Sequence, residues 1–280
     1  MTYAKFIPSP PLNAYINRVY YCDQPMPYAR EQILPMPWLN LMINFGGVFQ
    51  GYEAGQSQPF VTCTDSWWVG LRGAHHVIGW PPDMRLFIVD FKPGGAYPFL
   101  GLPVSELHNQ VVSLDTIWGN FAAEMRERLY AAPTTEARFA LLERLLLARL
   151  GQVPNGFQTV QAAIVEIAGA HGVLSIRALS NHMGISQKHL ITQFKRLVGG
   201  TPKELARMYR FLHVLYTIDP AQPVDWTRIA HQFLYYDQSH FNHEFAAFTG
   251  LCPTDYLHMR RRVQAEHPQH APYLRQLATG

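Results

Sequence analysis

The side chains with the most specific chemistry occupy matching positions in two stretches of the chain. They are Gln187, Lys188, Ile191 and Thr192 in the first stretch, and Gln238, Ser239, Asn242 and His243 in the second. A lysine ammonium group donates to guanine, Asn and Gln form paired hydrogen bonds with adenine, and apolar groups contact the thymine methyl. On the outer face of a helix, these residue types are suited to recognising the edges of DNA bases.

Both stretches have the apolar spacing of an amphipathic helix, with large apolar residues at i, i+4 and i+7. These residues are Leu190, Phe194 and Leu197 in the first stretch, and Phe241, Phe245 and Phe248 in the second. The spacing predicts two helices that bury the apolar stripe. The candidate base-reading side chains then lie on the outward face, near the start of each helix.

The two helices belong to an internal repeat. "KHLITQFKRLVGGTPKELA" (188–206) aligns with "SHFNHEFAAFTGLCPTDYL" (239–257) at an offset of 51 residues. Upstream, residues 175–186 parallel residues 225–237, with one residue more in the turn of the second copy. Each copy therefore predicts a short helix, a turn and a second helix.

Capping residues mark the predicted ends of these helices. Ser175 and Ser186 are suited to N-caps in the first copy, Gly184 to the turn, and Gly199 to the C-cap. "TPKE" (201–204) is a capping box with Pro at the first helical position, and it opens a helix that connects the two copies. Asp225 and Asp237 are the corresponding N-caps of the second copy. Two structural helical hairpins are the alternative interpretation, but two copies in register favour DNA binding.

Residues 175–262 resemble the tandem helix-turn-helix region of the AraC/XylS (arabinose-regulator) family of bacterial transcription regulators. The motifs are "S-x-x-x-L" leading into "F-K-R-L-V-G-x-T-P", "I-A" at 229–230, "D-Q-S-H-F" at 237–241 and "F-T-G-x-x-P-x-x-Y" at 248–256. The resemblance implies that the second helix of each copy enters the major groove of double-stranded DNA and that the eight residues above contact bases. We expect phosphate contacts from Lys195, Arg196, Arg207, Arg210 and Arg228, although individual arginines can instead pair with acidic neighbours.

The second copy departs from the family pattern at several positions. Leu234 replaces the glycine usual at the turn, and Tyr235 replaces a phenylalanine. His243, Ala246 and Ala247 stand where basic residues are frequent. Fewer cations release fewer counterions from DNA, so we expect the first copy to contribute most of the affinity.

The N-terminal region predicts a different fold. Short apolar runs at 38–45, 67–71 and 85–91 are separated by Gly, Pro and Asp clusters, which favours a β-sandwich or barrel. "RLFIVDFKPGGAYPFLGLPVSEL" resembles, more weakly, the small cupin-like β-barrel that precedes a helical hairpin in many AraC/XylS regulators. Helical spacing over 116–131 and 135–150, with Pro133 between them, predicts that hairpin.

The predicted fold class is therefore α+β, a small β-barrel with a helical hairpin followed by an all-α domain of tandem helix-turn-helix units. The predicted boundaries are 1–150 for a sensing or dimerisation domain, 151–156 for a linker, 157–262 for the DNA-binding domain and 263–280 for a tail.

A role for the N-terminal domain is open between effector sensing and oligomerisation alone. The aromatic residues Trp38, Tyr52, Trp67 and Trp80 are candidates for an effector pocket, with a filled core as the alternative. Part of the leucine row Leu141, Leu142, Leu145 and Leu146 is a candidate dimer seam, and part packs on its own domain. A cupin-like metal enzyme fused to a DNA-binding module is disfavoured, since the adjacent residues His75 and His76 point to opposite faces of a strand.

Composition supports a regulator rather than an enzyme. Residues 157–262 carry 11 Lys and Arg against 7 Asp and Glu, whereas residues 1–156 carry 11 against 12, so the basic excess lies in the predicted DNA-binding domain. No phosphate-binding glycine loop, nucleophile elbow or HExxH motif occurs, and three separated cysteines give no zinc pattern. From these motifs we expect neither a cofactor nor a metal. Because no signal peptide and no apolar run of about 18 residues occur, we expect a cytoplasmic protein. RNA polymerase and a second copy of the chain are the further expected partners.

Overall fold

The computed structural model describes residues 3–268 and 277–278 of the chain. Residues 3–149, here called the β-domain, contain two antiparallel β-sheets, the second of which also includes Leu277–Ala278, and several helices, the last three of which cover the first sheet. Residues 157–266, here called the helical domain, contain seven helices. No helix in the part of the chain that the structure describes is long and apolar enough to span a lipid bilayer.

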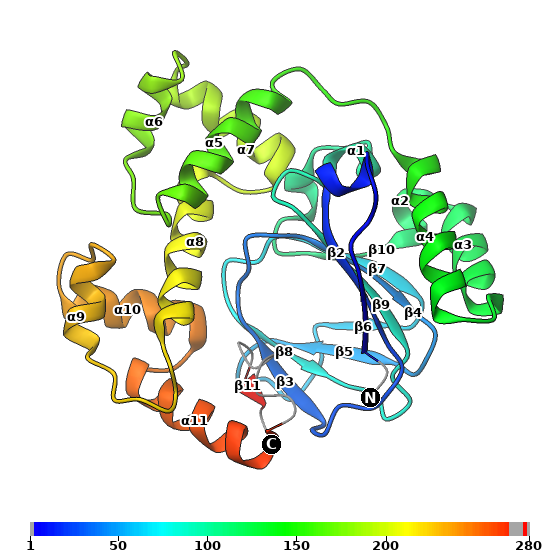
Figure 1. Ribbon diagram of the computed structural model, residues 1–280, viewed down its shortest axis with the longest axis horizontal. Helices are drawn as coiled ribbons and strands as arrows, with labels where there is room; N and C mark the ends of the chain where they lie inside the picture. Colours follow the sequence, from blue (N-terminus) through cyan, green and yellow to red (C-terminus); the bar gives the residue numbers. More distant parts are fainter. Residues whose placement is uncertain (1–2, 269–276, 279–280) are drawn as a thin grey trace.

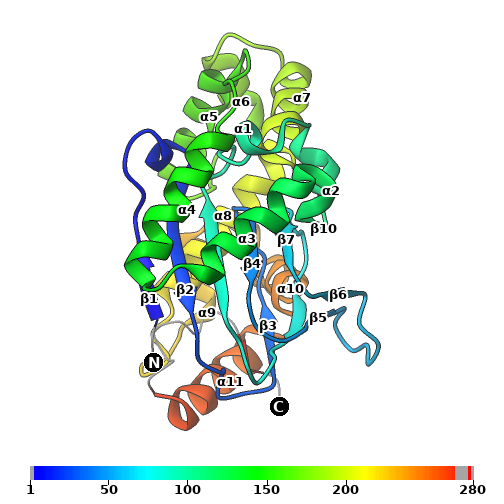
Figure 2. The same cartoon turned by 90° about the vertical axis from the view of Figure 1, so that its right-hand side faces the viewer.

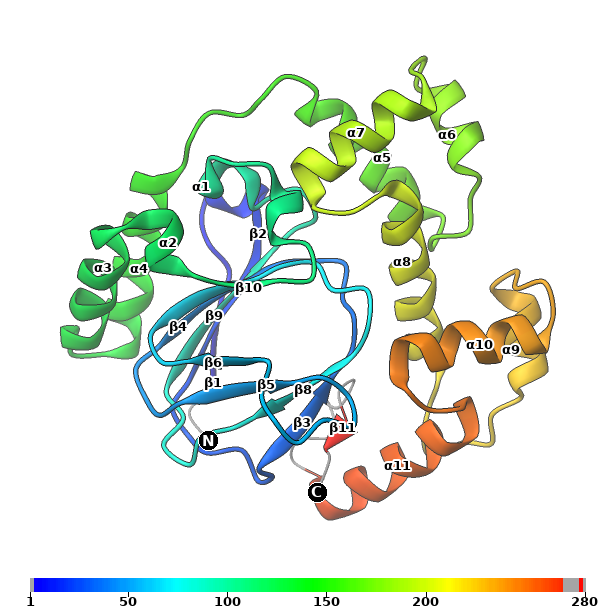
Figure 3. The ribbon, with the colours of Figure 1, turned by 180° about the vertical axis from the view of Figure 1, so that it is seen from behind.

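The first sheet has six strands and the second has five. In spatial order the first contains β1 (Tyr3–Phe6), β2 (Ile16–Cys22), β9 (Leu86–Phe91), β4 (Asn40–Asn44), β7 (Ser66–Val69) and β10 (Val111–Ser113). The second contains β11 (Leu277–Ala278), β3 (Arg30–Ile33), β8 (His76–Gly79), β5 (Phe49–Tyr52) and β6 (Val61–Cys63). Figures 1 and 3 show the two sheets as layers in the middle of the molecule.

The predicted order of a β-rich domain followed by a helical domain is confirmed, but the two sheets of the predicted small β-barrel are not joined into one cylinder. Each sheet keeps its own edge strands, and among the described residues no strand of one sheet pairs with a strand of the other. A barrel closes only when hydrogen bonding continues around the whole circumference. The region is therefore a two-sheet sandwich, which the strand pattern of the sequence also allowed.

The predicted helical hairpin covers the outer face of the six-stranded sheet (Figure 2). Helix α2 (Leu114–Trp118) leads into α3 (Asn120–Ala131), and α4 (Thr135–Arg149) follows after Pro133. The leucine row on α4 is buried, with Leu142 and Leu146 each 1% exposed. All four leucines pack in the core of their own domain, which corrects their assignment as a dimer seam.

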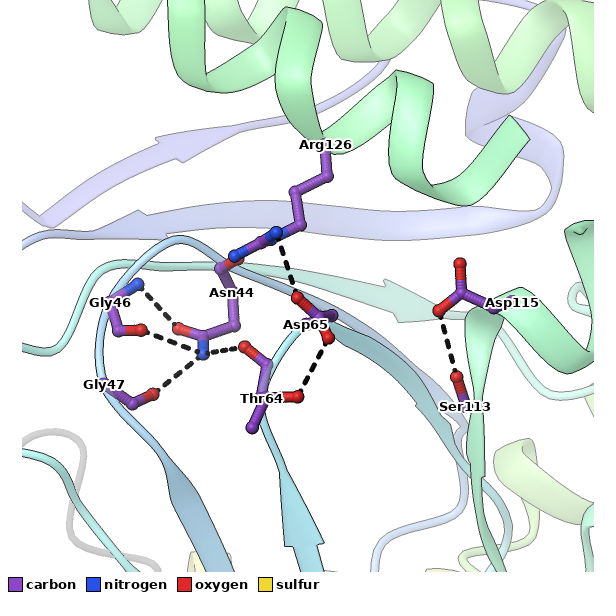
Figure 4. Close-up of polar contacts among 8 residues, drawn as sticks. All are labelled: Asn44, Gly46, Gly47, Thr64, Asp65, Ser113, Asp115 and Arg126. Carbon is purple, nitrogen blue, oxygen red and sulfur yellow. Dashed lines mark hydrogen bonds and ion pairs between the residues drawn. The ribbon is translucent and has the colours of Figure 1, made fainter. Parts of the chain in front are cut away.

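A buried asparagine ties this hairpin to the sandwich (Figure 4). The Asn44 side chain donates to the backbone oxygens of Gly47 and Thr64, both at 2.8 Å, and accepts from the backbone nitrogen of Gly46 at 3.0 Å. Arg126 of α3 donates to the Asn44 backbone oxygen at 2.7 Å and forms an ion pair with Asp65 at 3.0 Å. Asn44 is completely buried, so its bonds replace those that water would supply.

The helical domain contains the predicted repeat. Its helices are α5 (Phe157–Gly169), α6 (Ile176–His182), α7 (Gln187–Val198), α8 (Pro202–Thr217), α9 (Trp226–Gln232), α10 (Gln238–Thr249) and α11 (Pro253–Glu266). Ser175, Ser186, Asp225 and Asp237 all accept capping hydrogen bonds from the helices that they precede, as predicted. The capping box of Thr201 and Glu204 at the start of α8 is also confirmed.

The C-terminal segment differs from the predicted tail. Helix α11 ends at Glu266, four residues beyond the predicted end of the DNA-binding domain at 262, and Leu277–Ala278 form β11. Strand β11 pairs with β3, so the end of the chain returns to the β-domain. The rest of the predicted tail, 269–276 and 279–280, lies outside the described residues.

The β-domain lies between its own hairpin and the helical domain (Figures 1 and 3). Both helix-turn-helix units contact it with the C-terminal end of their second helix. Gly199 and Gly250 end α7 and α10 with left-handed φ angles of 97° and 70°. A Cβ atom would lie 3.0 Å from Val104 at Gly199 and 2.7 Å from His75 at Gly250. Glycine therefore permits both the turn and the close approach.

Candidate nucleic-acid interface and intersheet cavity

Helix α7 presents the first set of candidate base-reading residues. Its apolar stripe is fully buried, and Gln187, Lys188 and Thr192 are exposed, whereas Ile191 is half-buried. The Thr192 hydroxyl donates to the backbone oxygen of Lys188 at 3.0 Å, so it bonds within the helix. Lys188 forms no ion pair among the described residues.

Helix α10 presents the second set in the same way. Phe248 stacks on Phe211 of α8, with ring centroids 4.6 Å apart, which fixes α10 against the connecting helix. Gln238, Ser239 and His243 are exposed and Asn242 is half-buried. The Gln238 carboxamide oxygen accepts from the Thr227 hydroxyl at 3.1 Å, which orients its side chain before any DNA is bound.

The turn between α9 and α10 exposes two large side chains. Leu234, at the position where the family has glycine, adopts a left-handed φ of 50° and is 68% exposed. Tyr236 is 90% exposed. Left-handed backbone costs a non-glycine residue roughly 1–2 kcal/mol. The departure at Leu234 thus keeps the glycine conformation without the glycine.

The predicted phosphate-binding cations fall into two groups. Arg207 and Arg210 of α8 both bind Glu244 of α10, at 2.8 and 3.0 Å. Arg196 donates to the Tyr97 hydroxyl of α1 (Tyr97–Leu100) at 3.0 Å. The side chains of Lys195 and Arg228 are exposed, and in the described part of the chain neither forms an ion pair. Arg207 and Arg210 therefore hold α8 against α10, and Arg196 contacts the β-domain. Lys195 and Arg228 face solvent instead.

Residues 179–259, which include both second helices, match the family model described as a helix-turn-helix domain. The C-terminal domain is an AraC-type helix-turn-helix domain. The chain therefore carries the DNA-binding domain of a transcription regulator, as its repeat and motifs predicted. Residues 4–113 match a family model described as a domain of unknown function (DUF6597). No curated protein matches the chain.

Among solved structures, the regulator is similar to ToxT from Vibrio cholerae. One ToxT structure is 9% identical, covers 92% of this chain and 98% of that chain, and gives a TM-score of 0.43. ToxT with a bound unsaturated fatty acid is 10% identical, covers 92% and 96%, and gives 0.44. A cadmium complex of PhpD with hydroethylphosphonate is 12% identical over 67% of this chain and 43% of that chain, with a TM-score of 0.22.

A cavity of about 520 Å³ lies between the two sheets of the β-domain. Side chains from the facing strands β2, β4 and β9 on one sheet and β3 and β8 on the other line it. Trp38 and Trp80, two of the four candidate residues for an effector pocket, line this intersheet cavity. Tyr52 and Trp67 do not line it, which corrects their assignment to the pocket. Trp67 is 7% exposed and packs on Phe49 with centroids 5.3 Å apart, and the Tyr52 ring lies under Arg30 at 4.2 Å.

The intersheet cavity contains several buried charged or polar groups. Arg18 donates to Asp90 at 2.8 Å, and Asn40 donates to the other Asp90 oxygen at 2.6 Å. Burial raises the pKa of Asp90, against the lowering effect of Arg18. Burial, together with Arg72, lowers the pKa of His76 to about 3, so this imidazole is neutral. Such a mixture of apolar walls and few polar groups is typical of small-molecule sites.

The adjacent histidines His75 and His76 do not share a site in the β-domain. No group of three or more His, Cys, Asp or Glu residues suited to a metal ion occurs among them. His76 lies in β8 and lines the cavity, while its neighbour His75 packs beside Gly250 of the helical domain. The two imidazoles therefore serve different surfaces.

Sequence reasoning missed most of the cavity's polar residues. Arg18 and Tyr20 alternate along β2 with Val19 and Tyr21, which are each only 1% exposed. This two-residue alternation was a usable signal for a cavity-facing side. Glu31 lies in the four-residue strand β3, "REQI", whose polar composition gives no comparable signal.

Proposed function

We propose that the regulator reads DNA with the exposed faces of α7 and α10. Lys188 donates to guanine, Asn242 and Gln238 bind adenine, and Ile191 contacts a thymine methyl. Lys188 and Gln238 are exposed and Ile191 and Asn242 are half-buried, all on the face opposite a fully buried apolar stripe, which supports this assignment. Ser239 and His243 lie on the same face of α10 and complete the contact surface.

Lys195 and Arg228 are the phosphate contacts that the surface favours, because neither is bound to an acidic neighbour in the described residues. Arg207 and Arg210 instead position α10 through Glu244. When DNA binds, Arg196 exchanges its hydrogen bond to the Tyr97 hydroxyl for a contact with a DNA phosphate. Phosphate contacts set the register of a protein on DNA and carry no base information.

The first unit supplies most of the affinity. Helix α7 carries Lys188, Lys195 and Arg196, whereas α10 carries no lysine or arginine and includes Glu244. Binding of α7 therefore releases more counterions from DNA than binding of α10, which gives α7 the larger contribution to affinity. We expect Lys188→Ala to weaken binding to a selected DNA site more than Asn242→Ala does. A larger loss from Asn242→Ala would contradict this order, and no preference for any sequence over bulk competitor DNA would contradict base reading.

The intersheet cavity is the proposed effector site, and its enclosed position between two sheets carries the proposal. A cavity of about 520 Å³ is within the range of small-molecule sites. The test is thermal unfolding of the full chain against a panel of small organic molecules. A bound effector raises the midpoint of the native chain. It raises the midpoint of a Met42→Trp variant less, because the larger side chain occupies part of the cavity.

With these two roles, DNA reading and effector binding, the proposed regulator needs no enzymatic activity. Because it acts on chromosomal DNA, we propose that it works in the cytoplasm. RNA polymerase and a second copy of the chain are the remaining proposed partners. Tyr130 and Leu147, on α3 and α4, are 57% and 39% exposed. They are the apolar side chains of the hairpin that a second copy can contact.

A further inference from the structure

We propose that the intersheet cavity selects a small organic cation, an ammonium group on an apolar body, and that Glu31 is its counter-charge. The inference rests on the proposed effector role of the cavity and specifies the class of ligand. It follows from the charges that line the cavity, one of which has no opposite partner.

Glu31 is the charge without an opposite partner. It lies in β3, lines the cavity and is 3% exposed. The Tyr28 hydroxyl donates to its Oε1 at 3.3 Å, and its Oε2 is buried without a hydrogen bond of normal geometry. Among the described residues Glu31 forms no ion pair. Burial raises the pKa of Glu31 to about 7, against smaller lowering effects of Tyr28 and Trp80.

The other buried charges of the cavity are already compensated. Asp90 is bound to Arg18 at 2.8 Å. Arg72 is bound to Glu53 at 3.0 Å and donates to a backbone oxygen. An anionic ligand at either arginine must share the cation with a carboxylate that is already bound to it. A cationic ligand meets Glu31 without displacing an existing ion pair, so the cavity favours a cation.

The exposed rim does not reverse this preference. Lys5 and Asp23 both line the cavity and are both exposed, so their opposite charges offset each other and are screened by solvent. The enclosed carboxyl of Glu31 is shielded from that screening. Its interaction with a bound ammonium group is correspondingly stronger.

The walls suit the rest of such a ligand. Tyr28, Trp38 and Trp80 supply aromatic rings, whose faces attract ammonium groups. Met26, Met36 and Met42 supply flexible thioether chains that adapt to apolar bodies of different shape. The cavity thus combines one available negative charge with aromatic and apolar surroundings.

The test uses three probes with the same phenyl body, namely phenethylammonium, 2-phenylethanol and phenylacetate. Binding to the full chain is measured by calorimetry and by tryptophan fluorescence, because Trp38 and Trp80 line the cavity. We expect the ammonium probe to bind at least about tenfold more tightly than the other two, as a hydrogen bond to a charged group predicts. Glu31→Gln removes this preference and keeps the shape of the side chain.

The matched control is Asp23→Asn, which neutralises an exposed carboxylate at the rim of the same cavity. It leaves the preference for the ammonium probe unchanged if Glu31 is the counter-charge. Equal loss in both variants would show general surface attraction and overturn the inference. Circular dichroism and DNA binding check that each variant is folded.

The failure of the ligand class is distinguishable from failure of the effector role. Tighter binding of phenylacetate or 2-phenylethanol that is lost in Met42→Trp overturns the cation class and keeps the cavity as a ligand site. Binding of none of the probes overturns the cation class. Ammonium binding that Met42→Trp does not weaken places the probe elsewhere and overturns the inference as well.

Discussion

The Gln32 side chain donates through Nε2 to the backbone oxygen of Thr249, at the C-terminal end of α10, with an N–O distance of 2.5 Å. Gln32 is 6% exposed and Thr249 is completely buried. Successive side chains of a strand point to opposite faces. In β3, Glu31 therefore faces the intersheet cavity while Gln32 faces the helical domain. One short strand connects the proposed ligand site with a base-reading helix.

Gln32→Ala removes this interdomain hydrogen bond. We expect a loss of about 1 kcal/mol in the free energy of unfolding, the usual contribution of a hydrogen bond. We also expect the effect of a cavity ligand on DNA affinity to shrink, because β3 no longer holds α10. Urea unfolding and DNA titration with and without phenethylammonium measure both. Gln264→Ala on exposed α11 is the control, and an equal response in both variants would refute the coupling.

Glu31 makes stability depend on pH. Its pKa is raised from 4.5 to about 7, so the folded protein holds the proton more tightly than the unfolded chain. Stability therefore falls as pH rises from the unfolded to the folded pKa and is constant above it. Glu31→Gln lacks this loss, so its stability relative to the native chain rises by roughly 3 kcal/mol between about pH 4 and about pH 8. Urea unfolding at both pH values measures the difference, and a constant difference would disprove the shift.

Gly250→Ala tests the close approach of α10 to the β-domain. Left-handed backbone costs alanine roughly 1–2 kcal/mol, and the new Cβ meets His75 as well. We expect a lower unfolding midpoint. Gly73→Ala is the matched control, because no atom lies within 4 Å of its Cβ position and its φ is not left-handed. Similar losses in the two variants would remove any special role for position 250.

Lys195 and Arg207 are expected to affect DNA binding differently. Lys195→Ala removes an exposed cation, so the slope of log affinity against log salt becomes shallower by about one. Arg207→Ala removes a cation already bound to Glu244 at 2.8 Å, so the slope changes little while thermal stability decreases. Titration of one selected site at several salt concentrations measures both slopes. A shallower slope for Arg207→Ala would identify Arg207 as a phosphate contact.

Local chemistry in the sequence was sufficient to predict the helical domain. Ser186, Gly199 and Asp237 each fix a helix end through their own backbone and side-chain preferences, so their roles are visible without the rest of the fold. The apolar spacing of α10 likewise needs only about two turns of helix to be recognised.

The intersheet cavity was not predictable in the same way, because strands far apart in the sequence build it. Trp67 and Trp68 illustrate the difficulty. They point to opposite faces of β7, yet both are buried, since helices cover one face of that sheet and the second sheet covers the other. An aromatic residue type in the sequence therefore did not distinguish a side chain that lines the cavity from one that packs in the filled core. The roles of Arg207 and Arg210 were equally hard to predict, because their shared partner Glu244 lies on another helix.

The matching contacts of Gly199 with Val104 and of Gly250 with His75 affect the distance between the two base-reading helices. The connecting helix α8 alone would allow the two units to swing about its ends. Because both units contact the same β-domain, that domain fixes the distance between them. We therefore expect the preferred spacing between the two half-sites on DNA to change with residues 75 and 104, which touch no base.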